Sequence, residues 1–302
     1  MSCDAGRSRS GAELKLVFLG SPAPAATALR ALHQAGHEIA LVVTRPDKRR
    51  GRGPEATPTP AKQAAEELGL PVTSDIAQVK ASGAELGIVV AYGRIIKPDV
   101  LAAVPMVNIH FSLLPRWRGA APVERAILAG DSTTGVCLMD VDEGLDTGAV
   151  YGCRRVAVGP DETAAQLTGR LADLGAEMLV EALAAGLGDP VAQQGEPTYA
   201  AKIEPEDLHL DWARTALELH RVVRIGRAWT TWRGRRLLVP AASPTAPDPA
   251  DPVDGPPGTV TGGVVATGSG GLRLDTVQPE GKRPMTAAEW LRGAGGSVRL
   301  GT

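Results

Sequence analysis

Continuous apolar runs alternate with Ala- and Leu-rich helical patterns along the first part of the chain. The run LKLVFLG (14–20) is apolar throughout, as expected of a parallel strand covered on both faces. A helical pattern follows over 23–35 and ends at Gly36, and EIALVVT (38–44) supplies the next strand. This βαβ unit predicts a doubly wound α/β sheet.

The same alternation continues well beyond the first unit. AKQAAEELG has a helical pattern, LPVT is a short strand, and the apolar runs at 86–93 and 106–111 predict two more buried strands. PVERAILAGD predicts a helix, TGVCLMDV a strand and 161–187 a long helix. We expect a frayed N-terminus over 1–13 and an α/β domain over 14–190.

The character of the sequence changes after about residue 190. Residues 191–207 are polar and contain prolines, which predicts a linker lying on a surface. Residues 208–302 begin with a helical pattern and continue as short strand-like runs separated by Gly, Pro and Asp. This pattern predicts a small β-barrel, with an oligonucleotide-binding (OB-like) barrel as one candidate, and a mobile Pro-rich loop at 244–258.

Composition excludes a few classes of protein. The net charge of -2 and pI near 6.2 give no overall basic signal, so any nucleic-acid contact must come from local clusters of Arg and Lys. The three cysteines lack the spacings of a zinc site or a disulfide framework, which fits a reducing compartment. The polar start of the chain does not resemble a secretory signal, and no run approaches the roughly 20 apolar residues that span a bilayer. We therefore expect a cytoplasmic protein without a membrane partner.

Three polar residues follow predicted strands and are candidates for chemistry. Asn108 and His110 are two apart on one strand, so their side chains leave the same face of the sheet. Asp146 lies in the glycine-flanked loop DEGLDTG after another strand. Each residue also has a structural alternative, since Asn108 and His110 could be local hydrogen-bonders and Asp146 an Asx-turn residue. Spacing alone does not choose between the two.

The segments HFSLLPRWRGAAP and MDVDEGLDTG resemble the signature stretches of the folate-dependent formyltransferases. The resemblance implies a Rossmann-like catalytic domain and makes Asn108, His110 and Asp146 the catalytic set. It implies 10-formyltetrahydrofolate as the formyl donor and no metal, in keeping with the lack of metal-ligand spacing. It also implies a set of folate-binding residues in three loops: Ser112, Leu113, Leu114 and Pro115 in SLLP, Arg94, Ile95 and Ile96 in AYGRII, and Val141 and Asp142 in VDEG.

The chemistry of formyl transfer explains these residue types. Attack of an amine on the formyl carbon creates an oxyanion, to which an amide and an imidazolium can donate hydrogen bonds worth about 3–4 kcal/mol per donor. A carboxylate can orient the imidazole and move a proton from the amine to the leaving nitrogen. We expect Asp146 in that role, and His110 can exchange protons as well.

The signature is shared by enzymes that act on a purine precursor, on amino sugars and on charged tRNA, so flanking segments must identify the acceptor. TRPDKRRGRGPEATPTPAKQ resembles the loop by which the tRNA-specific members engage the acceptor arm of initiator methionyl-tRNA. It offers phosphate contacts at Arg45, Lys48, Arg49, Arg50 and Arg52. Pro54 and Glu55 stand where many members continue with lysines, which weakens the positive field of this loop.

The second domain also resembles the appended barrel of the tRNA-specific members. We expect Arg224 and Arg227, within a dense run of arginines, to contact tRNA. The alternatives are an amino-sugar (nucleotide-sugar) formyltransferase with the same catalytic set, and an RNA-binding module without activity. No obligatory protein partner is evident from the sequence.

Overall fold

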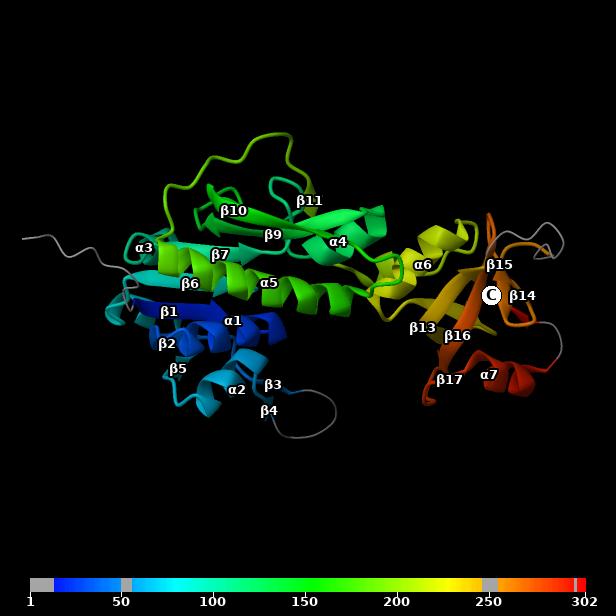
Figure 1. Ribbon diagram of the computed structural model, residues 1–302. Coiled ribbons are helices and arrows are strands. Elements are labelled where there is room, and N and C mark those ends of the chain that lie inside the picture. The colour runs from blue at the N-terminus through cyan, green and yellow to red at the C-terminus, as the bar shows by residue number, and fades with distance from the viewer. Residues whose placement is uncertain (1–13, 50–55, 246–254, 296–297) are drawn as a thin grey trace, which may run out of the picture. The chain divides into compact units, whose positions relative to one another are not determined.

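The computed structural model describes residues 14–49, 56–245, 255–295 and 298–302, which form two compact units (Figure 1). Unit 1 comprises the described residues of Met1–Pro122, Thr133–Ala157 and Thr168–Ala200. Unit 2 comprises those of Val123–Ser132, Val158–Leu167 and Ala201–Thr302. The predicted linker is therefore divided, with 191–200 in the first unit and 201–207 in the second.

Unit 1 is built on a seven-stranded sheet whose order is β10-β9-β7-β6-β1-β2-β5. Strands β7, β6, β1, β2 and β5 run parallel to one another. Strand β9 pairs antiparallel with β7, and β10 pairs antiparallel with β9. Their bounds are β1 Lys15–Gly20, β2 Glu38–Val43, β5 Val72–Thr73, β6 Leu86–Val90, β7 Met106–His110, β9 Thr133–Asp140 and β10 Val150–Ala157. The order changes direction at β1, so the carboxyl ends of β1, β6 and β7 form the edge at which open α/β sheets bind ligands.

Helices cover both faces of this sheet, which confirms the doubly wound prediction. On one face lie α1 (Ala23–Gln34), which packs against α2 (Pro60–Glu67), and α5 (Ala164–Ala185) (Figure 1). On the other face, the short helices η1 (Ile76–Ala81) and α3 (Pro98–Leu101) pack on alternate residues of the strands. Burial on both sides explains why the strands are apolar throughout.

Two short ladders shape the loops of unit 1. Strands β3 (Lys48–Arg49) and β4 (Ala56–Thr57) pair antiparallel within the predicted basic loop. Strands β8 (Arg118–Gly119) and β11 (Tyr199–Ala200) pair parallel and join the segment after SLLP to the predicted linker.

Unit 2 is a near-closed antiparallel barrel, which confirms the small-barrel prediction. Its strands follow the order β12-β13-β16-β15-β14-β18, with β17 beside β16. Trp212 and Trp290 lie in an apolar core with Leu219, Val239 and Leu272. The strands are β12 Trp229–Trp232, β13 Arg235–Thr245, β14 Thr259–Thr261, β15 Val264–Ala266, β16 Gly271–Pro279, β17 Met285–Thr286 and β18 Val298–Arg299. The helices are α4 Pro122–Ala129, η2 Pro205–Leu208, α6 Ala216–Ile225 and α7 Ala287–Ala294.

Two of the elements that were not predicted are β10 and α7. Strand β10 was not predicted, because VYGCRRVA alternates half-buried and exposed residues and carries two arginines. Helix α7 is also new, and a capping box between Thr286 and Glu289 begins it. Most of the predicted Pro-rich loop, 246–254, lies outside the described residues.

Candidate active site

Strand β7 presents Asn108 and His110 on one face of the sheet of unit 1. Ile109 points to the opposite face, where a Cβ added to Gly175 of α5 would lie 2.6 Å from its Cγ2. Met106 is two residues before Asn108 on the strand and so lies on the same face as Asn108 and His110. It packs in the cluster under η1 and α3. The two candidate residues thus leave the strand on the face away from α5, at its carboxyl end.

His110 is buried, with 5% of its surface exposed, and both ring nitrogens have neighbours. Its Nε2 lies 2.9 Å from the carbonyl oxygen of Trp117. Because a carbonyl only accepts, Nε2 must carry the hydrogen and donate it. Its Nδ1 lies 3.7 Å from Oδ2 of Asp146. The Nδ1 side of the ring therefore faces a carboxylate.

Asp146 is held in an uncommon backbone conformation. Its φ is 51°, in the left-handed region, and its Oδ2 accepts a 2.7 Å hydrogen bond from the backbone N–H of Gly119. Asp142 accepts hydrogen bonds through Oδ1 from Gly144 N at 3.0 Å and from Thr147 Oγ1 at 2.6 Å, which closes the loop. The structure therefore brings Asp146 to His110, although 36 residues separate Asp146 from His110 in sequence.

The SLLP loop is a compact turn beside this pair. Ser112 is fully buried, and its hydroxyl donates to the carbonyl oxygen of Arg116 at 2.6 Å. Leu113 lies over β9, where a Cβ on Gly135 would be 2.5 Å from its Cδ2. The Ser112 side chain is thus used inside the loop, which leaves backbone groups and the apolar side chains for any ligand.

The AYGRII loop at the end of β6 has one exposed and one buried isoleucine. Ile95 is 90% exposed, whereas Ile96 is buried in the cluster under η1 and α3. Arg94 is exposed. Val141, the candidate on the facing loop, packs against the same cluster as Ile96.

Arg45, the first arginine of the basic loop, was predicted to contact a phosphate, but in the structure its guanidinium binds backbone carbonyl groups. Arg45 donates from Nε to the carbonyl oxygen of Tyr92 at 3.2 Å and from Nη2 to that of Gly93 at 2.6 Å. It therefore ties the loop after β2 to the loop after β6. Lys48 and Arg49 lie on β3, and Arg50 and Arg52 lie outside the described residues.

Arg224, which was predicted to contact tRNA, lies inside unit 2 in this structure. Arg224 is only 8% exposed, and its guanidinium donates to the carbonyl oxygens of Glu162 and Gly159, each at 2.8 Å. Burial lowers the pKa of Arg224, whose guanidinium binds groups inside unit 2. Arg227, in contrast, is exposed and stays a prediction.

Sequence reasoning missed a group of residues that support the site from the 191–200 segment. Thr198 accepts a 2.9 Å hydrogen bond through Oγ1 from Trp117 N, next to the carbonyl that receives His110. Gln193 contacts both Arg118 and the backbone of the Asp146 loop. No periodic pattern marks a single Gln or Thr in a polar segment, so neither residue could be recognised from the sequence.

The cysteines also differ from expectation. Cys137 of β9 and Cys153 of β10 form a disulfide, although their spacing does not indicate one. They face each other across adjacent antiparallel strands, where directly opposed residues come close enough for a disulfide. His110 is the partner of Cys137 on the other side of β9. Within the described residues, no three His, Cys, Asp or Glu side chains are grouped to hold a metal ion.

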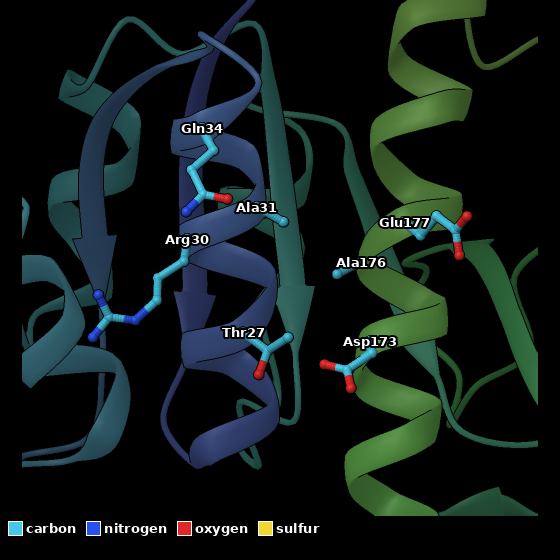
Figure 2. A pocket seen from close by; sticks show the side chains of 7 residues that line it. All are labelled: Thr27, Arg30, Ala31, Gln34, Asp173, Ala176 and Glu177. Atoms are coloured by element: carbon cyan, nitrogen blue, oxygen red, sulfur yellow. The ribbon is translucent and has the colours of Figure 1, made fainter.

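A shallow groove of about 410 Å³ lies between α1 and α5, away from these residues (Figure 2). It is lined by Thr27, Arg30, Ala31, Gln34, Asp173, Ala176 and Glu177. Because α1 and α5 lie on the face opposite to Asn108 and His110, the groove is not part of the candidate site. In the described parts of the chain, none of the helices combines the length and apolarity needed to cross a membrane.

Comparison with known proteins gives consistent matches along the chain. The model of the formyl transferase family matches residues 14–183, and that of the formyl transferase C-terminal domain matches 202–295. A methionyl-tRNA formyltransferase of Symbiobacterium thermophilum is 44% identical, with 96% of this chain and 94% of that protein covered. One of Methylococcus capsulatus is also 44% identical, with 96% and 100% covered.

A solved structure shares the fold at low identity. HypX from Aquifex aeolicus in complex with tetrahydrofolic acid aligns with a TM-score of 0.63 and 18% identity over 93% of this chain. The chain spans about half the length of HypX, because the alignment covers 47% of it. At this identity the likeness shows the fold alone.

Proposed function

Because the chain belongs to the formyl transferase family, we propose that it transfers the formyl group of 10-formyltetrahydrofolate to the α-amino group of methionine on initiator Met-tRNA. The observation that carries the mechanism is the position of the Asp146 carboxylate, 3.7 Å from Nδ1 of a buried His110 on the strand that also bears Asn108. The near full-length similarity to methionyl-tRNA formyltransferases supports the acceptor.

In this reaction the amine nitrogen bonds to the formyl carbon, the bond from that carbon to N10 breaks, and a proton passes from the amine to N10. Asn108 donates a hydrogen bond to the oxyanion that forms on the formyl oxygen, and a protonated His110 donates one through Nδ1, because its Nε2–H is already bound to the carbonyl oxygen of Trp117. Asp146 stabilises the His110 imidazolium and accepts a proton from the attacking amine, directly or through a water. The 3.7 Å separation exceeds a hydrogen bond, so the pair must tighten, or bridge through water, when the substrates bind.

The loops beside this pair fit a reduced folate. A pterin is a flat ring with amide-like edges, which calls for backbone hydrogen bonds and apolar cover. Ile95, which is 90% exposed beside buried Ile96, supplies an apolar side chain that could lie on such a ring. The backbone of Arg94, Val141 and Asp142 supplies donors and acceptors, and the apolar side chains of SLLP (Leu113, Leu114 and Pro115) line the formyl end.

For the tRNA we propose that the acceptor arm is bound. Lys48, Arg49, Arg50 and Arg52 would contact phosphates from the unit 1 loop, and Arg227 from the barrel, with residues 14–190 catalytic and 208–302 binding RNA. The enzyme would act in the cytoplasm without an obligatory protein partner.

The test is formyl transfer from labelled 10-formyltetrahydrofolate to initiator Met-tRNA, elongator Met-tRNA and a nucleotide-linked amino sugar, assayed side by side. We expect the initiator tRNA to be formylated far faster than the other two acceptors. Transfer to the amino sugar with none to tRNA would replace the proposed acceptor, and transfer to none of the three would leave only a binding role.

A further inference from the structure

The 191–200 segment is attached to the candidate site at both ends. Val150 and Val191 exchange two backbone hydrogen bonds, at 2.8 and 2.9 Å. At the other end, β11 pairs with β8, and Thr198 binds Trp117 N. The segment therefore belongs to the fold of unit 1 on both sides of the Asp146 loop.

Gln193 uses both ends of its side-chain amide in this segment. Its Nε2 donates to the carbonyl oxygens of Asp146 and Gly148, each at 2.8 Å. Its Oε1 accepts from Arg118 Nε at 3.0 Å and from Arg118 Nη2 at 2.7 Å. Four hydrogen bonds converge on one half-buried amide, and two of them come from a charged donor, which makes them the stronger kind.

The backbone that Gln193 holds is the one that aims the Asp146 carboxylate. Asp146 has a φ of 51°, a conformation that costs a non-glycine residue about 1 kcal/mol or more and persists when its surroundings fix it. Gly148, two residues further on, cannot carry a side chain, since a Cβ would lie 2.0 Å from the carbonyl oxygen of Asp140. Arg118 precedes Gly119, whose N–H binds the same carboxylate. Gln193 thus links the two backbone segments that contact Asp146.

We propose that Gln193, held by Arg118, is a positioning residue that fixes the Asp146 carboxylate against His110 for formyl transfer. It touches neither His110 nor any reacting atom in the geometry described above, and it acts through Asp146. This inference rests on the proposed function, because it assigns Asp146 its role in the reaction.

The decisive variants are Gln193→Glu and Gln193→Met in the full chain. The glutamate keeps the length but replaces two donors with oxygens that face two carbonyls, and the methionine removes all four hydrogen bonds. Since a misplacement of about 1 Å can cost roughly a hundredfold in rate, we expect kcat to fall about 10- to 100-fold. The KM values for Met-tRNA and for 10-formyltetrahydrofolate should change by less than about threefold, because binding groups are untouched.

The neighbouring Gln194 offers matched controls, since it is exposed and has the same chemistry. Gln194→Glu and Gln194→Met should retain the kcat of the unsubstituted protein. If both Gln193 variants kept kcat within about twofold, the positioning role would be overturned. If they instead lost affinity for the unreactive 5-formyl isomer of the folate by the same factor as kcat, the residue would shape the folate pocket, which also overturns the proposal.

A double-variant cycle separates action through Asp146 from a general structural role. In an Asp146→Asn background, Gln193→Glu should lower the remaining kcat by less than about twofold, because groups that act as a unit are not additive. A full additional loss would overturn the inference. Absence of formyl transfer by the unsubstituted protein would count against the proposed function, whereas normal transfer with unaffected Gln193 variants would count only against this inference.

Discussion

Two polar segments of this chain look alike in sequence but are built differently. The 191–200 segment and the loop from Arg45 to Thr57 are both poor in apolar residues and follow regular elements. The first is joined to β8, β10 and the Asp146 loop through backbone and buried side-chain hydrogen bonds. In the described part of the second, the joints include the two-residue ladder β3–β4, the backbone N–H and guanidinium of Arg45, and an ion pair between Asp47 and Lys62.

Polar side chains have different roles in these two segments. In the 191–200 segment the side chains of Gln193 and Thr198 are turned inward to satisfy backbone groups near a reacting centre, where an unpaired group would cost about 1–3 kcal/mol. In the basic loop, the charges have the right type to meet phosphates, which is a long-range and salt-dependent interaction. Substitutions should therefore change kcat in the first segment and KM in the second.

The largest effects should come from the reacting residues that the 191–200 segment supports. Asn108→Ala, His110→Ala and Asp146→Ala should each lower kcat at least about a hundredfold, because each removes a donor or a proton acceptor from the transition state. Single-turnover transfer to Met-tRNA measures this directly. Glu143→Ala, an exposed acid in the same loop as Asp146, is the control and should behave as the unsubstituted protein. Any of the three retaining full kcat would remove that residue from the mechanism.

A second effect should follow from loosening the 191–200 segment without touching Gln193. Thr198→Val keeps the shape but removes the hydroxyl that accepts from Trp117 N, and losing such a hydrogen bond costs about 1 kcal/mol. Because Trp117 also receives His110 through its carbonyl, we expect kcat to fall about tenfold along with the melting temperature. Thr133→Val, at an exposed position, is the matched control. A lower melting temperature with normal kcat would show that His110 is oriented without this support.

The sequence predicted the strands and helices of unit 1 well where both faces are buried, because uniform apolarity identifies such strands. It failed at β10, whose Arg154 and Arg155 suggest a loop, although antiparallel pairing with β9 determines its structure. It also failed to predict the roles of Gln193 and Thr198. Their partners are backbone groups far along the chain, and hydrogen bonds of that kind leave no periodic pattern.

For the site, the three candidate catalytic residues that the resemblance identified lie together, whereas two of the arginines predicted to contact tRNA bind backbone groups of the protein itself. Asn108, His110 and Asp146 occupy one end of the sheet. Arg224 and Arg45, which were chosen as cations for tRNA, donate instead to backbone carbonyl oxygens. A guanidinium has five donors and can bind carbonyl oxygens inside a protein as readily as phosphates outside it. The charge of an arginine therefore does not reveal whether its side chain points into the protein or toward a ligand.

Substitutions of Arg52 and Arg45, two arginines of the basic loop, should have different effects. Arg52→Ala should raise the KM for Met-tRNA, leave kcat unchanged and reduce the slope of log affinity against log salt by about one. Arg45→Ala should also lower kcat or raise the KM for the folate, because its guanidinium holds the carbonyls of Tyr92 and Gly93 beside the folate loop. Binding and steady-state assays between about 50 and 200 mM salt would test both. If both variants changed kcat, the KM values and the salt dependence equally, the two arginines would not have the separate roles assigned to them.

The smallest effect concerns the ion pair at the base of the same loop. Lys62 Nζ lies 2.6 Å from Asp47 Oδ2, and this hydrogen bond raises the pKa of Lys62 above 10.5, its ordinary value. A raised pKa means that the pair stabilises the folded state below pH 10.5 and stops doing so as the pH rises through the folded-state pKa. Lys62→Gln should therefore melt slightly below the unsubstituted protein at pH 8, and the difference should shrink above pH 10.5. Lys97→Gln, at an exposed lysine, controls for loss of charge. A melting difference that is constant with pH would show that Lys62 stabilises the fold by packing and not by its charge. The base of the basic loop would then be held to α2 by contacts that do not depend on charge, as the 191–200 segment is held to its neighbours.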